Sequence, residues 1–97
     1  MTKLIVKAKA KKDLRAIARY IAQDNPERAH TFAEELIGRM KAVGENPLLY
    51  RLREEWGSDH RSAVHKGYHI VFRVTDSGVH IVRVLHGSQD IVPALGS

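Results

Sequence analysis

Three apolar runs joined by two short turns occupy residues 61–90, and they restrict the possible folds more than any other part of the chain. The segment RSAVHKGYHIVFRVTDSGVHIVRVLHGSQD predicts strands at 61–65, 68–74 and 79–86. Lys66-Gly67 and residues 75–78 supply the turns, and Lys66-Gly67 is short enough for a two-residue hairpin. Strands joined by such tight turns run antiparallel. The second half of the chain therefore predicts an antiparallel sheet.

A short strand and an amphipathic helix precede this sheet. Residues 3–7 (KLIVK) predict a strand because their centre is apolar and β-branched. From Ala10 onward the period changes, and Leu14, Ile17, Ala18 and Ile21 recur at the spacing of one helix face. Several of the other positions hold basic residues, Lys11, Lys12, Arg15 and Arg19. We therefore expect much of the exposed surface of this helix to be basic.

A second helix follows almost immediately. Pro26 cannot continue the first helix, but it suits the first turn of a new one, with Asn25 as the capping residue. Apolar residues then recur at helical spacing from position 29 to position 40. We expect Gly44 to end this helix in a left-handed conformation, and Pro47 to prevent it from resuming. The short connection between the two helices predicts an antiparallel helical hairpin.

The predicted architecture is an α+β fold of one domain, residues 1–97. Its element order is β-α-α-β-β-β, with an antiparallel sheet covered on one face by the α-helical hairpin. Residues 45–60 show no sustained period. We expect them to form a surface loop that is partly held down by its aromatic residues, Tyr50 and Trp56.

The last predicted strand departs from simple alternation of apolar and polar residues. In a regular strand, one side would carry Val79, Ile81, Arg83 and Leu85, and the other side would carry His80, Val82, Val84 and His86. Such a strand is either central and covered on both faces, or it keeps one apolar face for a partner. The sequence leaves both readings open.

The composition restricts the kind of partner and the environment. Sixteen Lys and Arg residues against eleven Asp and Glu give a net charge of +5 and a pI near 9.8. This excess favours a nucleic acid or an acidic protein segment as partner, although it also suits a chain that only needs to stay soluble. The chain has no cysteine and no apolar run long enough for a signal peptide or a membrane span. We expect a cytoplasmic protein that does not enter a membrane.

Few residues suggest a metal, a cofactor or a catalytic nucleophile. Six histidines are present, but pairing across Lys66-Gly67 would place His65 and His69 on opposite sides of the sheet. No motif for zinc, for a nucleotide cofactor or for a serine nucleophile occurs. We therefore predict no metal site, no cofactor and no catalytic residue.

Cleavage of RNA is the enzymatic alternative that needs weighing. A ribonuclease that works without a metal requires a base, an acid and cations around the phosphate. The chain has these residue types in its second half, at Glu54, Glu55, His60, Arg61, Arg83 and His86. Basic residues there also alternate with aromatics, a pattern that can bind phosphates and bases or an acidic protein segment.

Four segments together resemble the ParE branch of the RelE/ParE toxin family. They are the short N-terminal strand, the helical region DLRAIARYIAQDNPERAHTFAEEL, the NPLLYR loop, and GYHIVFRV followed by HIVRVLHGSQDI. Each piece alone is unspecific, but their order covers nearly the whole chain.

The resemblance implies the toxin component of a type II toxin–antitoxin system. Such a toxin is neutralised by a cognate antitoxin in a hetero-oligomeric complex, which can bind operator DNA through the antitoxin. Toxins of the ParE type inhibit DNA gyrase, and so DNA replication, without acting as enzymes. The candidate residues for contact with the target are Trp56, Arg61, Arg73, Arg83, His86 and Asp90. The candidates for contact with the antitoxin are Leu14, Ile17, Ile21, Val82 and Val84.

Two alternatives remain within the same family. RelE-type relatives cut messenger RNA on the ribosome, but the tail GSQDIVPALGS lacks the late tyrosine of many of these nucleases. The family also often has arginine where Gln89 stands in the His-Gly-x-x-Asp motif. This departure raises the third possibility, a non-toxic remnant that still binds its antitoxin.

Overall fold

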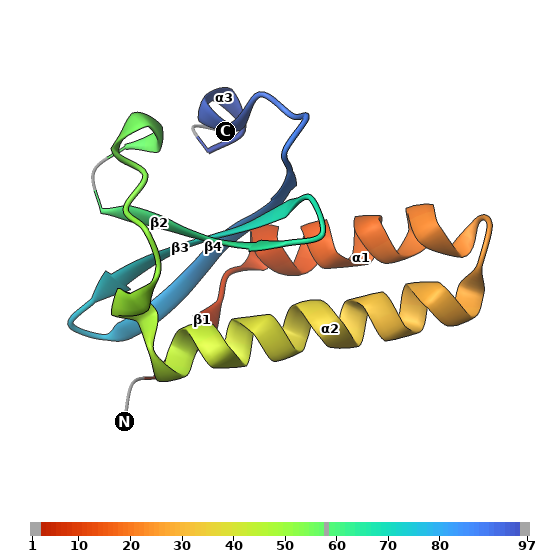
Figure 1. Cartoon of the computed structure of the whole chain (residues 1–97), viewed down its shortest axis with the longest axis horizontal. Coiled ribbons are helices and arrows are strands. Elements are labelled where there is room, and N and C mark those ends of the chain that lie inside the picture. The colour runs from red at the N-terminus through yellow and green to blue at the C-terminus, as the bar shows by residue number, and fades with distance from the viewer. Residues whose placement is uncertain (1–2, 58, 96–97) are drawn as a thin grey trace.

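The structure is a computed structural model that describes residues 3–57 and 59–95. Its elements follow the predicted order, and the α+β prediction is confirmed (Figure 1). Two 3-10 turns, η1 (Pro47–Leu49) and η2 (Glu54–Trp56), lie in the predicted loop, and a short C-terminal helix was not expected. The helices and strands are β1 (Leu4–Val6), α1 (Ala8–Ala22), α2 (Pro26–Glu45), β2 (His60–His65), β3 (Tyr68–Thr75), β4 (Gly78–His86) and α3 (Ile91–Leu95).

The four strands form one sheet in the order β1-β4-β3-β2. Strands β2, β3 and β4 are antiparallel, as predicted. Strand β1 differs from the expectation, because it pairs with β4 in parallel. Its pairing rests on backbone hydrogen bonds at both ends, from the N–H of Val79 to the carbonyl of Lys3 and from the N–H of Lys7 to that of Ile81. The helical hairpin between β1 and β2 thus returns the chain to the opposite edge of the sheet.

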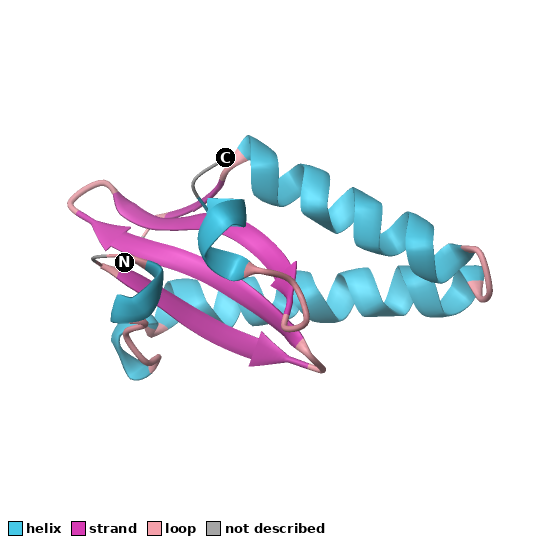
Figure 2. Cartoon of the chain, turned by 90° about the horizontal axis from the view of Figure 1, so that it is seen from above, coloured by secondary structure: helices cyan, strands magenta, loops and turns pink. Residues whose placement is uncertain are grey.

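Helices α1 and α2 lie side by side on one face of the sheet and extend beyond its end (Figures 1 and 2). The core between the two layers buries large side chains from α2, β3 and β4. Removing such side chains from water is the main stabilising contribution to a fold of this size. The fully buried core includes Leu36, Met40, Val43, Ile70, Phe72, Val79 and Ile81.

A β-bulge in β4 explains why its apolar residues did not alternate. Val71 pairs with Arg83, whereas the next residue, Phe72, pairs with Ile81. Val82 is therefore an extra residue on β4, and side chains after it change sides. Val84 packs in the same core as Ile81, so the predicted grouping of Val84 opposite that residue is wrong.

The second face of the sheet is also partly covered. Val71, Leu85 and Ile91 are buried, and they lie outside the core cluster beneath the helices. Figure 1 shows α3 and the η2 turn on the side of the sheet away from α1 and α2. Of the two readings left open for the last strand, the structure has the central strand with cover on both faces.

Local sequence signals explain where the second helix begins, but not where it ends. Asn25 accepts a hydrogen bond from the backbone N–H of Arg28 at 3.1 Å, and Pro26 occupies the first helical position, as predicted. The prediction for Gly44 is wrong, because α2 continues to Glu45. A Cβ at position 44 would lie 3.4 Å from the side chain of Leu4, so this glycine lets β1 approach the helix closely.

Candidate partner-binding surfaces

Arg83 was predicted to contact a target, but its side chain is occupied inside the protein. Its Nε and Nη2 donate to the carboxylate of Asp13 on α1 at 2.7 and 3.0 Å, and Nη1 donates to the carbonyl of Ala94 at 2.7 Å. The two charged side chains are only 16% and 15% exposed. The hydrogen bond to Asp13 raises the pKa of Arg83 above its usual value. Arg83 therefore joins β4 to α1 and α3.

The carboxylate of Asp13 also forms a hydrogen bond with the backbone of β4. Strand β1 ends at Val6, so the edge of β4 beyond that point lacks a strand partner. The carboxylate of Asp13 accepts the backbone N–H of Val84 there, at 2.9 Å. A buried N–H without a partner is costly, so Asp13 completes the edge of the sheet as well as the ion pair.

Arg61 and Arg73, the other two predicted arginines, differ in their surroundings. Arg61 lies on β2 and donates from Nη1 to the carbonyl of Tyr50 at 2.7 Å, which fastens the long loop to the sheet. Arg73 lies on β3, is exposed, and makes no side-chain hydrogen bond or ion pair within the described part of the chain. Only Arg73 of the two is available for a partner.

The predicted role of the aromatics in the loop is confirmed. Tyr50 packs edge-on against Phe72, with ring centroids 5.7 Å apart. Trp56 packs edge-on against His69 at 5.1 Å, and the guanidinium of Arg53 lies 4.1 Å from its ring centroid. Trp56 is half-buried, so part of its surface remains open beside a cation.

The histidines of the hairpin separate as predicted. His65 points toward α2, where its Nε2 lies 2.8 Å from a carboxylate oxygen of Glu35. His69 lies on the other side, with Nδ1 2.9 Å from the hydroxyl of Ser62. Partial burial lowers the pKa of His69, with smaller effects from the nearby charges of Arg53 and His86.

The His-Gly-x-x-Asp segment, residues 86–90, forms a closed turn after β4. The backbone N–H of His86 donates to Oε1 of Gln89 at 2.7 Å, and its ring nitrogen Nδ1 lies 2.6 Å from the hydroxyl of Ser88. The N–H of Gly87 donates to the carbonyl of Gly67 in the β2–β3 turn at 2.8 Å. Gln89 therefore helps to shape the turn, while Asp90 is exposed directly before α3.

The five residues predicted to face an antitoxin are not equally accessible. Leu14, Ile17 and Ile21 are partly buried and pack against the core from α1, which leaves their outer edges exposed. Val82, the bulge residue, is also half-buried. Val84 is 2% exposed and belongs to the core, so it cannot face a partner in this structure.

Sequence reasoning missed the most exposed large hydrophobic residues of the described chain. Leu48 and Leu49 in η1 are 71% and 82% exposed. A hollow of about 400 Å³ lies between them and Val74, and a second hollow of about 280 Å³ lies between Leu48, Leu52 and Arg61. Two adjacent leucines in a loop without periodicity were the signal that could have revealed this surface.

An ionic cluster fastens the β2–β3 hairpin to α2. Glu35 accepts from Arg28 at 2.7 Å, and it lies near His65 and Lys66 at 2.8 and 3.4 Å. These contacts, led by the hydrogen bond from Arg28, lower the pKa of Glu35 to about 2. The cluster holds its charges in internal contacts and keeps Glu35 ionised near neutral pH.

Several of the side chains proposed for a nuclease already have partners within the protein. Arg61 donates to the carbonyl of Tyr50, and Arg83 is paired with Asp13. Glu55 pairs with Arg53 at 3.0 Å. Within residues 3–57 and 59–95, no group of three His, Cys, Asp or Glu side chains could hold a metal ion. In the same residues, no helix is long and apolar enough to cross a membrane.

Comparisons with known proteins agree on the family and the fold. Residues 4–91 match the family described as the ParE toxin of the type II toxin–antitoxin system, parDE. A solved structure of the chromosomal ParDE system from P. aeruginosa is similar in fold, with a TM-score of 0.77. The two chains share 22% sequence identity, and the similarity covers 89% of this chain and 96% of the other. No curated protein matches the sequence.

Proposed function

Because this chain belongs to the ParE toxin family of type II toxin–antitoxin systems, we propose that it inhibits DNA gyrase and so blocks DNA replication. The family match over residues 4–91 is the observation that carries this proposal. In this account the chain binds its target in the cytoplasm and is not an enzyme. The internal contacts of Glu55, Arg61 and Arg83 support binding over RNA cleavage, because each of these side chains is already engaged within the protein.

For the contact with gyrase, we propose the turn after β4 and its surroundings. Trp56, His86 and Asp90 are at least partly exposed, and Arg73 adds an exposed cation on the same sheet. Aromatic residues and arginines contribute much of the energy in protein interfaces. Arg61 and Arg83 are left out of this proposed contact because they bind within the protein.

We further propose that a cognate antitoxin neutralises the chain by covering its helical hairpin. The half-exposed row of Leu14, Ile17 and Ile21, together with Val82, offers apolar surface to such a partner. Amphipathic segments commonly bind to surfaces of this kind through regularly spaced apolar side chains. The complex would be hetero-oligomeric, with any operator DNA bound through the antitoxin.

Production of the chain alone in a susceptible bacterium tests the proposed target. We expect filamentous cells with DNA damage signalling, and linear DNA when purified gyrase, supercoiled plasmid and the chain are mixed and then denatured. Rapid loss of translation with cut messages would instead establish the RelE-type nuclease. Normal growth would identify a non-toxic remnant, in line with Gln89 at the usual arginine position.

The antitoxin is tested separately, by producing the chain together with the product of the neighbouring small gene. We expect the pair to copurify and growth to recover. Growth arrest that persists despite production of the second protein would contradict neutralisation by that protein, whatever the target is.

A further inference from the structure

The positive charge of this protein is concentrated on one helix. Residues 3–23 hold seven of the sixteen Lys and Arg residues but only one of the eleven Asp and Glu residues. The rest of the chain has nine basic residues and ten acidic ones. The net charge of +5 therefore comes from α1 and the residues directly before it.

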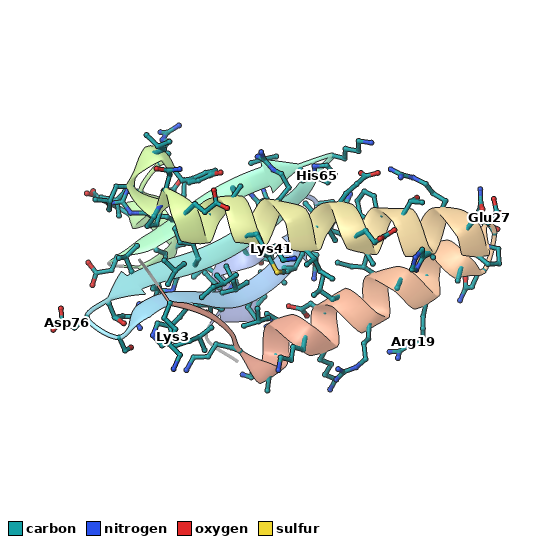
Figure 3. All side chains as sticks on the ribbon, turned by 90° about the horizontal axis from the view of Figure 1, so that it is seen from below. Lys3, Arg19, Glu27, Lys41, His65 and Asp76 are labelled. Atoms are coloured by element: carbon teal, nitrogen blue, oxygen red, sulfur yellow. The ribbon has the colours of Figure 1, made fainter. Side chains whose placement is uncertain are left out.

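Four of these cations share the outer side of α1, which we call the α1 cationic face. Lys9, Lys12, Arg15 and Arg19 follow one another at spacings of three or four residues, which places them on neighbouring turns. All four are exposed, and none makes a side-chain hydrogen bond or ion pair within the described residues. In Figure 3, Arg19 points away from α2 on this side of the molecule.

The single acidic residue of the helix does not neutralise this face. The carboxylate of Asp13 is bound to Arg83 and to the backbone N–H of Val84. Beside it lies a hollow of about 270 Å³, which Ala16 leaves open between Lys9 and Lys12. An anionic group placed there would meet two unpaired ammonium groups, while the negative charge of Asp13 is already balanced.

The arrangement costs stability in an isolated helix. Like charges three or four residues apart destabilise a helix. Lys9 also lies in the first turn, which contains no acidic residue, and there the helix dipole disfavours a cation. Binding to a polyanion would offset these repulsions between cations through attraction to its negative charges.

The chemistry of the face fits a nucleic acid backbone better than a protein. Protein interfaces need an apolar centre, but this face offers only alanine side chains and, at its edge, Tyr20. From Lys9 to Arg19 the helix rises about 15 Å, which corresponds to about four base pairs of a double helix. Cations spaced along such a length can each meet a phosphate.

We propose that the α1 cationic face binds the phosphate backbone of duplex DNA without reading its sequence. The choice of DNA among polyanions rests on the proposed function, since gyrase holds duplex DNA while cutting that DNA. The toxin would then contact the DNA through α1 as well as gyrase through its sheet. Binding of this kind depends on counterion release and weakens steeply as salt increases.

Fluorescence anisotropy of a labelled, mixed-sequence duplex of about 20 base pairs tests the proposal with the purified full chain. We expect a dissociation constant in the micromolar range at low salt, and a slope of log K against log salt of about −3 to −4. The triple variant Lys12→Gln, Arg15→Gln and Arg19→Gln should bind at least about tenfold more weakly and reduce the slope by about 3.

A matched control separates the face from the net charge. The variant Lys41→Gln, Arg51→Gln and Lys66→Gln removes three exposed cations elsewhere, so its net charge equals that of the first triple variant. It should bind DNA within about threefold of the original chain. Equal losses in both triple variants would overturn the proposal, as would the absence of DNA binding by the original chain. Circular dichroism checks that both variants fold.

A polyglutamate peptide of the same total charge as the duplex tests the other class of partner. If it displaces the duplex at equal charge concentration, the face binds acidic polypeptide and the assignment to DNA is wrong. Because these measurements contain no gyrase, their outcome is independent of the gyrase assay. DNA binding with no effect on gyrase would contradict the proposed function alone, and a gyrase effect without DNA binding would contradict this inference alone.

Discussion

At the residue scale, the ion pair between Arg83 and Asp13 is the contact that most changes how the sequence is interpreted. An arginine on a strand was expected to meet a partner, yet it binds a carboxylate 70 positions earlier in the chain. Both side chains are largely buried, so removing either one would leave the other buried without a counter-charge. A loss of toxicity in an Arg83 variant would therefore reflect the fold before it reflected a contact with the target.

Replacing Asp13 with asparagine should cost about 3 kcal/mol of unfolding free energy. The change leaves the guanidinium of Arg83 buried without a counter-charge, and breaking a buried pair on one side is strongly destabilising. Urea unfolding measures the loss. Glu55→Gln is the control, since its carboxylate is 55% exposed and ion pairs at the surface contribute little to stability. Equal losses of unfolding free energy in the two variants would contradict a larger contribution from the buried pair.

Glu35 should make stability depend on pH in the acid range. Its pKa in the folded chain is about 2, below its ordinary value of 4.5, so the unfolded chain takes up the proton first as the pH falls. The stabilisation is complete above about 4.5 and is lost as the pH decreases toward about 2. Glu35→Gln should flatten this dependence when urea midpoints are compared across the range.

Glu34 is the control for that experiment. It precedes Glu35 on α2, is 66% exposed, and lies 3.3 Å from His30. The Glu34→Gln variant should keep the acid dependence of the original chain. If it instead flattens the dependence as much as Glu35→Gln does, the ionic cluster of the hairpin is not the source.

At the element scale, two glycines should respond to alanine in opposite directions. Gly38 lies in the middle of α2, and a Cβ added there would have no atom of a neighbouring segment within 4 Å, so Gly38→Ala should add about 0.5–1 kcal/mol of stability. Gly78 begins β4 with a φ of +133°, and a Cβ there would collide with the carbonyl oxygen of Lys3. Gly78→Ala should cost about 2 kcal/mol or more by straining the junction with β1. Urea unfolding of both variants checks the signs.

The same scale shows what the sequence could predict. Asn25-Pro26 and Lys66-Gly67 act through local backbone chemistry, and φ values of 47° and 87° in the second pair fit a two-residue hairpin turn. The bulge at Val82 and the parallel pairing of β1 depend on contacts between distant segments, so no local sequence pattern predicts them. Helix α3 spans five residues with a proline inside, which is too short for periodicity to reveal.

The candidate site was less predictable than the fold for a related reason. An exposed arginine and a paired one look the same in a sequence, so Arg73 and Arg83 received the same role. The difference comes from Asp13, which only the packing of α1 against β4 brings within 2.7 Å of Arg83. Residue type therefore predicted the chemistry available on the chain, while the tertiary contacts decided which groups remain open to a partner.

At the scale of the whole molecule, the uneven charge predicts a conflict between stability and DNA binding. Arg15→Glu places a carboxylate three or four residues from Lys11, Lys12 and Arg19, so repulsions become attractions. We expect the free energy of unfolding to rise by about 1 kcal/mol while the affinity for duplex DNA falls. Lys41→Glu changes the net charge equally, but it sets a carboxylate four residues before Glu45, so it should lower stability slightly and leave DNA binding unchanged. Urea unfolding and fluorescence anisotropy on the same two preparations measure both effects. A stable Arg15→Glu variant with undiminished DNA binding would contradict the binding of DNA by the α1 cationic face.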